Sequence, residues 1–189
     1  MPQRLVLHAR QGIAAQQSRH AREALGEDRV ALVGHRRAAL LAALEGLHDL
    51  RDLGVLEVAH LGREALQSLC DSLAPNPVVL AGRALEAPPI TGSHVRSLLN
   101  ETSIAQLIWL LRRARAIVSV DSGPMHIAAA VQPARTISIH TWSDPRCVGP
   151  YDRRARVWKA GRIAHRGGFS DAEAASVSSF AASDARRLA

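Results

Sequence analysis

Short apolar segments alternate with longer amphipathic segments along most of the chain, which is the pattern of strands followed by helices. In the clearest helix, residues 63–73, apolar side chains recur on one helical face at Leu66, Leu69, Cys70 and Leu73. The same reasoning predicts strands at 5–8, 30–33, 55–58, 78–82, 117–120, 136–139 and 157–158, and helices at 13–25, 36–47, 63–73, 103–113 and 127–131. Such alternation favours an α/β fold, with a parallel sheet covered by helices on both faces.

Two stretches of the chain show the alternation of apolar and polar residues less clearly. Residues 83–97 contain two adjacent prolines and a Thr-Gly pair, and we expect them to form a loop. Beyond Gly161, residues 169–173 have the composition of a capped helix start. The Ser/Ala-rich remainder fits a helix towards Arg187 and fits a frayed terminus equally well.

The apolar run 117–120 ends in Asp121-Ser122-Gly123-Pro124, and a small-residue helix is predicted directly afterwards. A strand that turns at once into a helix directs backbone N–H groups and the positive end of the helix dipole at one point. This arrangement suits an anion such as a phosphate or a diphosphate. The alternative is an ordinary tight turn in which Asp121 caps the helix. Spacing alone does not choose between them.

The expected position of this turn also bears on ligand binding. In open parallel sheets, ligands bind beyond the carboxyl ends of the strands, and Asp121 and Thr141 both follow predicted strands. The chain contains neither a GxGxxG nor a Walker motif. We therefore expect a ligand site at this edge and no cofactor.

Composition narrows the class of partner. The 189 residues are 47% hydrophobic and suffice for one domain or two very small ones. The net charge is +7, but Lys159 is the only lysine and the arginines are scattered without interleaved aromatic residues. The charge therefore indicates an ordinary solvated surface, and we do not expect nucleic acid as a partner.

Cys70 and Cys147 form no disulfide framework, and the histidines lack metal-ligand spacing, so we expect no metal. No apolar run approaches the ~18 residues of a transmembrane segment. The first residues lack the apolar core of a signal peptide. We expect a cytoplasmic protein, and peripheral association with the inner membrane stays open.

Residues 121–130 resemble the D-S/T-G-P-x-H-x-A-A-A signature of glycosyltransferase family 9, the bacterial lipopolysaccharide heptosyltransferases. Upstream, residues 100–103 are similar to the family's G-K-T-S segment, with Asn and Glu in place of Gly and Lys. Downstream, residues 143–151 are similar to its T-D-P…G-P loop. The resemblance is specific over about 99–151. It implies a Rossmann-like domain, either one half or a shortened version of the two-domain GT-B fold.

The resemblance implies donor- and diphosphate-binding roles on the signature and on the loops beside it. The residues concerned are Asp121, Ser122, Gly123, Pro124, His126, Thr102, Ser103, Thr141 and Asp144. Gly123 allows close approach of the backbone to a phosphate, Ser122 donates to a phosphate oxygen, and Pro124 suits the first helical turn. Asp121 either bonds a donor hydroxyl or caps the helix.

Alternatives stay open at the other positions. His126 either faces the ligand or is buried against a neighbouring carbonyl group. Thr102 and Ser103 are expected to be helix caps first and ligand contacts second. Thr141 and Asp144 either contact the nucleotide or sugar, or Asp144 belongs to an Asp-Pro turn. The resemblance assigns no catalytic base.

Other features of the family are missing. Residues 11–13 carry no Asp beside Gly12, where the family's acceptor domain has a Gly-Asp loop, and its lysine loop has no counterpart because Lys159 is distant. The resemblance implies metal-independent hexosyl or heptosyl transfer from a nucleotide-diphosphate sugar to a glycan or lipid-linked acceptor. The alternative is a catalytically silent nucleotide-sugar-binding or protein-interaction module, either a reduced relative of the family or a fragment that needs a protein partner to supply the missing parts.

Three parts of the chain are expected. Residues 1–54 form either a reduced acceptor domain or an extension of the same sheet. Residues 55–160 form the donor-binding domain, and residues 161–189 a helical tail.

Overall fold

The computed structural model describes residues 42, 44, 53–57, 61–85 and 88–188. The chain divides into two units, residues 1–45 and 46–189, and the second carries the fold. The strands predicted at 5–8 and 30–33 and the helix at 13–25 lie outside the described residues, as does nearly all of the helix at 36–47. The expected domain boundaries after residues 54 and 160 stay predictions.

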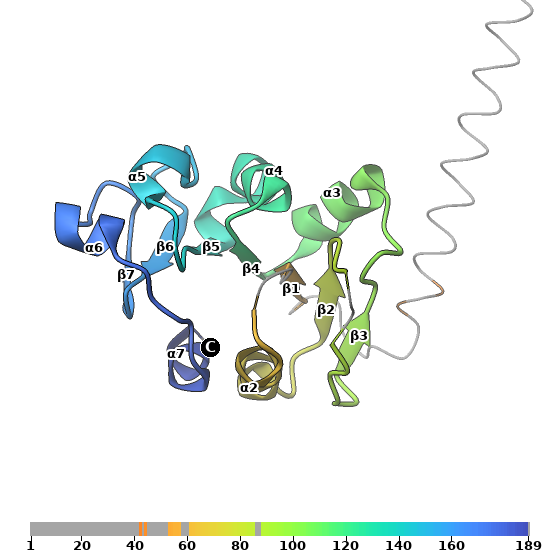
Figure 1. The fold of residues 1–189 in the computed structure, drawn as a ribbon. Coiled ribbons are helices and arrows are strands. Elements are labelled where there is room, and N and C mark those ends of the chain that lie inside the picture. Colours follow the sequence, from red (N-terminus) through yellow and green to blue (C-terminus); the bar gives the residue numbers. More distant parts are fainter. Residues whose placement is uncertain (1–41, 43, 45–52, 58–60, 86–87, 189) are drawn as a thin grey trace, which may run out of the picture. The chain divides into compact units, whose positions relative to one another are not determined.

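The second unit holds a seven-stranded sheet with the order β3-β2-β1-β4-β5-β6-β7 (Figure 1). The strands are β1 (Gly54–Glu57), β2 (Val78–Ala81), β3 (Val95–Ser97), β4 (Ala116–Val120), β5 (Thr136–Ile139), β6 (Arg156–Lys159) and β7 (Arg162–Ala164). All neighbouring strands are parallel except β7, which pairs with β6 in the antiparallel direction.

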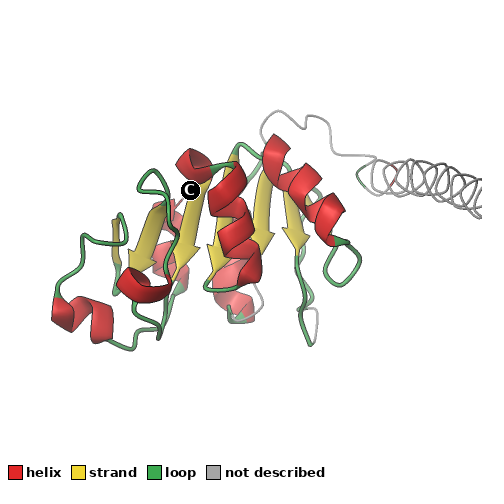
Figure 2. Cartoon of the chain, turned by 90° about the horizontal axis from the view of Figure 1, so that it is seen from above, coloured by secondary structure: helices red, strands yellow, loops and turns green. Residues whose placement is uncertain are grey.

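Helices cover both faces of this sheet, as the alternating pattern predicts. They are α2 (Arg63–Leu73), α3 (Ile104–Arg113), α4 (Gly123–Val131), α5 (Pro145–Val148), α6 (Asp171–Ala175) and α7 (Ala182–Leu188), with a short 3-10 helix at Pro133–Arg135. Helices α2 and α7 pack side by side on one face, and α3, α4 and α5 lie on the other (Figures 1 and 2). The predicted α/β fold is confirmed.

The strand order reverses between β1 and β4, which are neighbours in the sheet. From β1 the chain proceeds outwards through β2 to β3, and then returns to place β4 on the other side of β1. A reversal of this kind opens a crevice beyond the carboxyl ends of the two strands, where Rossmann-like domains bind their ligands. The turn that follows β4 begins at Asp121, so the signature lies at this crevice.

The core beneath α2 and α7 is built from alternate strand residues. Leu56, Val118 and Ile139 form one buried cluster with the apolar stripe of α2, which includes Leu66 and Leu69. The segment before α7 is anchored by an aromatic pair. The rings of Trp158 and Phe180 meet edge to face, with their centroids 5.0 Å apart.

Most of the predicted elements in the described region are confirmed. Helix α2 has the predicted bounds, and α3 begins with the predicted capping box, in which Ser103 and Gln106 exchange hydrogen bonds. Two short strands, β3 and β7, were not predicted, and β3 lies within the expected loop 83–97. Their residues are largely exposed at the two edges of the sheet, so they lack the apolar run that marks a buried strand.

The C-terminal region differs from a single continuous helix. Ser170 and Glu173 form a capping box that starts α6, but this helix ends at Ala175. The chain then crosses to the other side of the sheet and forms α7, which packs against α2 (Figure 1). The predicted helix start is therefore confirmed. Of the two alternatives for the remainder, one continuous helix towards Arg187 is wrong, because a separate helix, α7, covers Ala182–Leu188.

Candidate functional site

The turn between β4 and α4 presents the first turn of a helix without a side-chain cap. Ser122, and not Asp121, is the N-cap residue, and its hydroxyl donates to the carbonyl oxygen of Val120 at 3.1 Å. Within the described part of the chain, no side chain makes a cap hydrogen bond to the first turn, which also contains Pro124. The alternative in which Asp121 caps the helix is therefore wrong. The first-turn N–H groups of α4 remain available to an anionic ligand.

A cavity of about 510 Å³ lies beside this turn. This volume falls within the ~300–1,000 Å³ that is typical of small-molecule sites. The lining residues come from the end of β2, the start of α3 and the start of α4: Gly82, Arg83, Thr102, Ser103, Ile104, Leu107, Ser122, Gly123, Pro124 and Ile127. Five of the nine predicted site residues are thus brought together, although they come from two segments about 20 positions apart in the sequence.

The wall on the α3 side combines a fixed polar end with aliphatic side chains. The amide and the hydroxyl of Ser103 both donate to Oε1 of Gln106 at 2.9 Å, so Ser103 is a helix cap, as expected. The side chain of Thr102 makes no hydrogen bond within the described part of the chain, which leaves its hydroxyl available. Ile104 is 70% exposed at this wall. This wall therefore offers an exposed aliphatic surface beside polar groups.

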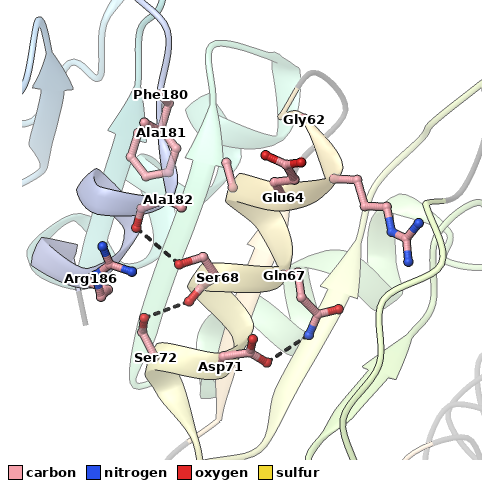
Figure 3. A pocket seen from close by; sticks show the side chains of 12 residues that line it. Gly62, Glu64, Gln67, Ser68, Asp71, Ser72, Phe180, Ala181, Ala182 and Arg186 are labelled. Carbon is pink, nitrogen blue, oxygen red and sulfur yellow. Dashed lines mark hydrogen bonds between the residues drawn. The ribbon is translucent and has the colours of Figure 1, made fainter.

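A larger cavity, of about 1050 Å³, lies elsewhere, on the face of the sheet that carries α2 and α7 (Figure 3). It is an open groove along α2, crossed by the hydrogen bond from the Ser68 hydroxyl to the carbonyl oxygen of Ala182 at 3.1 Å. None of the predicted site residues lines it. Volume alone would select this groove, but the signature and the strand reversal both lead to the smaller cavity.

Behind the signature lies a buried polar cluster that sequence reasoning missed. His140, directly after β5, is fully buried between two serine hydroxyls. Its Nδ1 lies 2.9 Å from Oγ of Ser143, and its Nε2 lies 3.1 Å from Oγ of Ser138. Nδ1 also lies 4.0 Å from Oδ2 of Asp121, whose side chain is 18% exposed. The cluster thus connects the signature aspartate to the neighbouring strand.

The hydrogen bonds assign the tautomer of His140. The Ser138 hydroxyl donates to the carbonyl oxygen of Arg156 at 3.4 Å, so it accepts from Nε2–H, and Nδ1 accepts from the Ser143 hydroxyl. Burial lowers the pKa of His140 to about 4, against an opposing effect of Asp121. His140 is therefore neutral at pH 7 and leaves the Asp121 carboxylate uncompensated.

Lys159, the only lysine of the chain, ties together two loops at this edge of the sheet. It is fully buried on β6, and its Nζ donates to the carbonyl oxygens of Ser143 and Ser176 at 3.1 and 2.6 Å. Burial lowers the pKa of this ammonium group. Lys159 is a structural brace for the loop after β5, and it does not line the cavity at the signature.

The four remaining predicted site residues lie outside the cavity. Asp121 faces the His140 cluster, while His126 is exposed on α4, so the alternative of a buried His126 is wrong. Thr141 is half-buried, and its carbonyl oxygen accepts from the Ser178 amide at 2.8 Å. Asp144 caps α5 and forms a salt bridge with Arg146, which lowers the pKa of its carboxyl group. The Asp-Pro turn is therefore present, and the ligand roles of these four residues stay predictions.

Stability is expected to depend on the protonation of His140. Its pKa in the folded state, about 4, lies below its ordinary value of 6.5, so the folded protein binds fewer protons than the unfolded chain between these values. Lowering the pH from 6.5 to 4 should therefore remove up to about 3 kcal/mol of stability. Urea denaturation at several pH values measures this loss.

The matched variant is His140→Gln, whose amide bridges the same two serines without titrating. Four charged or polar groups near His140 act on its pKa, namely Asp121, His126, Asp144 and Lys159. These groups remain in the variant, so the difference between the two curves isolates His140. Parallel curves for wild type and variant would show that His140 is not a buried neutral imidazole.

Among the described residues, no group of three or more His, Cys, Asp or Glu side chains is arranged to hold a metal ion. The helices of the same residues all fall short of the length and apolar character that a membrane span requires.

The strand order and the cavity at its reversal define a Rossmann-like α/β domain, of the type that forms one half of a GT-B fold. Residues 82–172 match the family model of glycosyltransferase family 9 (heptosyltransferase). The predicted resemblance is confirmed. Every residue that lines the cavity falls within the matched range. No curated protein and no solved structure matches the chain.

Proposed function

We propose that this chain binds a nucleotide-diphosphate sugar in the cavity between α3 and α4, as the donor-binding part of a glycosyltransferase. The observation that carries the proposal is the convergence of three features on one place. The family signature, the uncapped start of α4 and the reversal of strand order all meet at this cavity. The first-turn N–H groups of α4 bind the diphosphate, and the aliphatic wall of α3 contacts the base.

In this proposal, the residues outside the cavity contact the sugar. Asp121 accepts a hydrogen bond from a sugar hydroxyl, because its carboxylate lies 4.0 Å from a neutral imidazole and keeps acceptor capacity. His126, which is exposed on α4, donates to the diphosphate or the sugar. Thr141 and Asp144 lie on the next strand-end loop and border the same ligand.

The reaction is transfer of a hexosyl or heptosyl group to a glycan or a lipid-linked acceptor, in lipopolysaccharide synthesis. Such a transfer needs stabilisation of the leaving diphosphate, which the α4 N–H groups supply without a metal ion. It also needs a base for the acceptor hydroxyl, and no described residue is assigned to that role. A cytoplasmic location at the inner membrane, with a protein partner supplying the acceptor side, is part of this proposal.

The alternative is a catalytically silent nucleotide-sugar-binding or protein-interaction module. It is favoured by the absence of counterparts for the family's Gly-Asp loop and lysine loop in this sequence. Turnover of a nucleotide sugar by the purified chain would exclude this alternative. The alternative would be supported if the purified chain bound a nucleotide sugar without turnover, and if turnover appeared only after a protein partner was added.

The test of binding is a thermal-shift panel of ADP-, GDP- and UDP-sugars. A ligand at ~100 times its Kd should stabilise the wild type by about 2.7 kcal/mol, which raises Tm by several degrees. Asp121→Ala and His126→Ala should both reduce the shift, whereas Arg112→Ala, on an exposed residue at the end of α3, should not. No shift with any member of the panel would contradict the proposal.

A further inference from the structure

Arg83 is the one cationic residue among those that line the cavity. It follows Gly82 at the end of β2, and its side chain is exposed at the cavity. The other described lining residues are neutral, so the further positive potential comes from the starts of α3 and α4, each equivalent to roughly half a charge. A diphosphate in this cavity carries more negative charge than the two helix starts offset. A guanidinium group fits this requirement, because its planar N–H fork matches two phosphate oxygens.

Asn100 fixes the backbone on both sides of Arg83. Its own amide donates to the carbonyl oxygen of Gly82 at 2.9 Å. Its side chain pairs with the backbone of Ala84, where Oδ1 accepts from the amide at 3.1 Å and Nδ2 donates to the carbonyl oxygen at 2.9 Å. Asn100 adopts the left-handed conformation, with φ of 65°, which asparagine tolerates better than most residues. This conformation directs its side chain across to the loop after β2.

The guanidinium group of Arg83 is also oriented by Asn100. Its Nη1 donates to the carbonyl oxygen of Asn100 at 3.3 Å, a long hydrogen bond. Within the described residues Arg83 forms no ion pair. Among the described residues, no further hydrogen bond uses the remaining N–H donors of the fork, and no carboxylate pairs with them.

We propose that Arg83 binds the phosphate groups of the ligand in this cavity and that Asn100 is the residue that positions it. The proposal rests on the proposed function, and it names the cation that offsets the diphosphate in a chain without the family's lysine loop. It extends the site from the signature to the loop after β2. It also makes the affinity for the phosphate groups depend on a segment that carries none of the signature residues.

The test compares ligands with and without phosphate groups, by isothermal titration of the wild type and of Arg83→Gln. The probes are a nucleoside, its diphosphate and its diphosphate sugar, with the base that performs best in the thermal-shift panel. A hydrogen bond to a charged group contributes about 1.5–3 kcal/mol, so Arg83→Gln should weaken diphosphate binding roughly tenfold to a hundredfold. Nucleoside binding should not change, and Arg112→Gln should leave both affinities unchanged.

Asn100→Gly tests the positioning role. Glycine adopts the same left-handed backbone without strain, so the fold is retained while both hydrogen bonds to Ala84 are lost. Diphosphate affinity should fall by less than it does in Arg83→Gln, and nucleoside affinity should stay the same. In the double variant, Asn100→Gly should add nothing to Arg83→Gln, because the residue being positioned is already absent.

The outcomes separate the two proposals. If the wild type binds the diphosphate and Arg83→Gln binds it equally well, the role of Arg83 is wrong and the proposed function stands. Equal weakening of nucleoside and diphosphate would show that Arg83 only shapes the cavity, which also overturns its phosphate role. If the wild type binds none of the probes, the proposed function itself fails.

Discussion

Replacing Gly123 by leucine is expected to abolish nucleotide-sugar binding while leaving the fold intact. Gly123 begins α4 and lines the cavity, and a Cβ built on it meets no atom within 4 Å. Because the space around this Cβ is open, we expect the free protein to accommodate a larger side chain. The same space is where the ligand must approach the first-turn N–H groups, so a leucine side chain would exclude it. We expect Kd to rise by at least about a hundredfold, the loss of a few kcal/mol of binding free energy.

The matched control is Ala130→Leu, an exposed position on the same helix that does not line the cavity. Isothermal titration and thermal unfolding of both variants provide the measurement. The account requires a Tm close to that of the wild type for Gly123→Leu, together with lost binding. If a folded Gly123→Leu protein still bound the nucleotide sugar, the diphosphate would not bind at the start of α4.

Replacing Gly149 by alanine is expected to destabilise the protein strongly. Gly149 ends α5, and its amide donates to the carbonyl oxygen of Pro145 at 2.8 Å. A Cβ on Gly149 would lie 2.3 Å from that oxygen and 3.1 Å from the carbonyl carbon. Both atoms belong to the backbone, so relief requires movement of α5 and of the Asp144 cap that begins it. Overpacking of this kind costs about 3 kcal/mol, equivalent to a fall in Tm of roughly 10 °C.

Gly167→Ala is the control for this prediction. A Cβ at Gly167 makes ordinary contact with the ring of His165, at 3.7 Å or more. Its Tm should therefore stay within about 2 °C of the wild type. Equal Tm values for the two variants, measured by thermal unfolding, would mean that the loop around α5 adapts easily and does not hold the strand-end residues in place.

The elements that were predicted correctly carry their signal locally. Helix α2 shows a complete apolar stripe, and the capping box of α3 is encoded by two residues three positions apart. Strands β3 and β7 carry no such signal, because edge strands bury little and their few residues are mostly exposed. The break after α6 is set by the packing of α7 on α2, which is a contact between distant segments.

Some parts of the candidate site could likewise be predicted from local sequence, and others depend on contacts between distant segments. The cavity was predictable in outline, since the ends of parallel strands meet at one edge and the family signature marks one of them. The role of Arg83 depends on the contacts of Asn100 across two loops, which no spacing encodes. The burial of His140 and Lys159 likewise follows only from the folded sheet. The sequence offers one hint of the His140 cluster. In and directly after β5, the polar residues Ser138 and His140 alternate with apolar residues, so both side chains lie on the same face.

The most direct test of the central claim is to locate the bound ligand by NMR. Backbone amide shifts of the ¹⁵N-labelled chain would be followed during titration with the nucleotide sugar that stabilises it most. The account predicts the largest shifts at residues 82–84, 102–103 and 122–127, which line the cavity beside α4 or directly adjoin its lining residues. Shifts confined to α2 and α7, around the larger groove, or no shifts at saturating ligand, would contradict it.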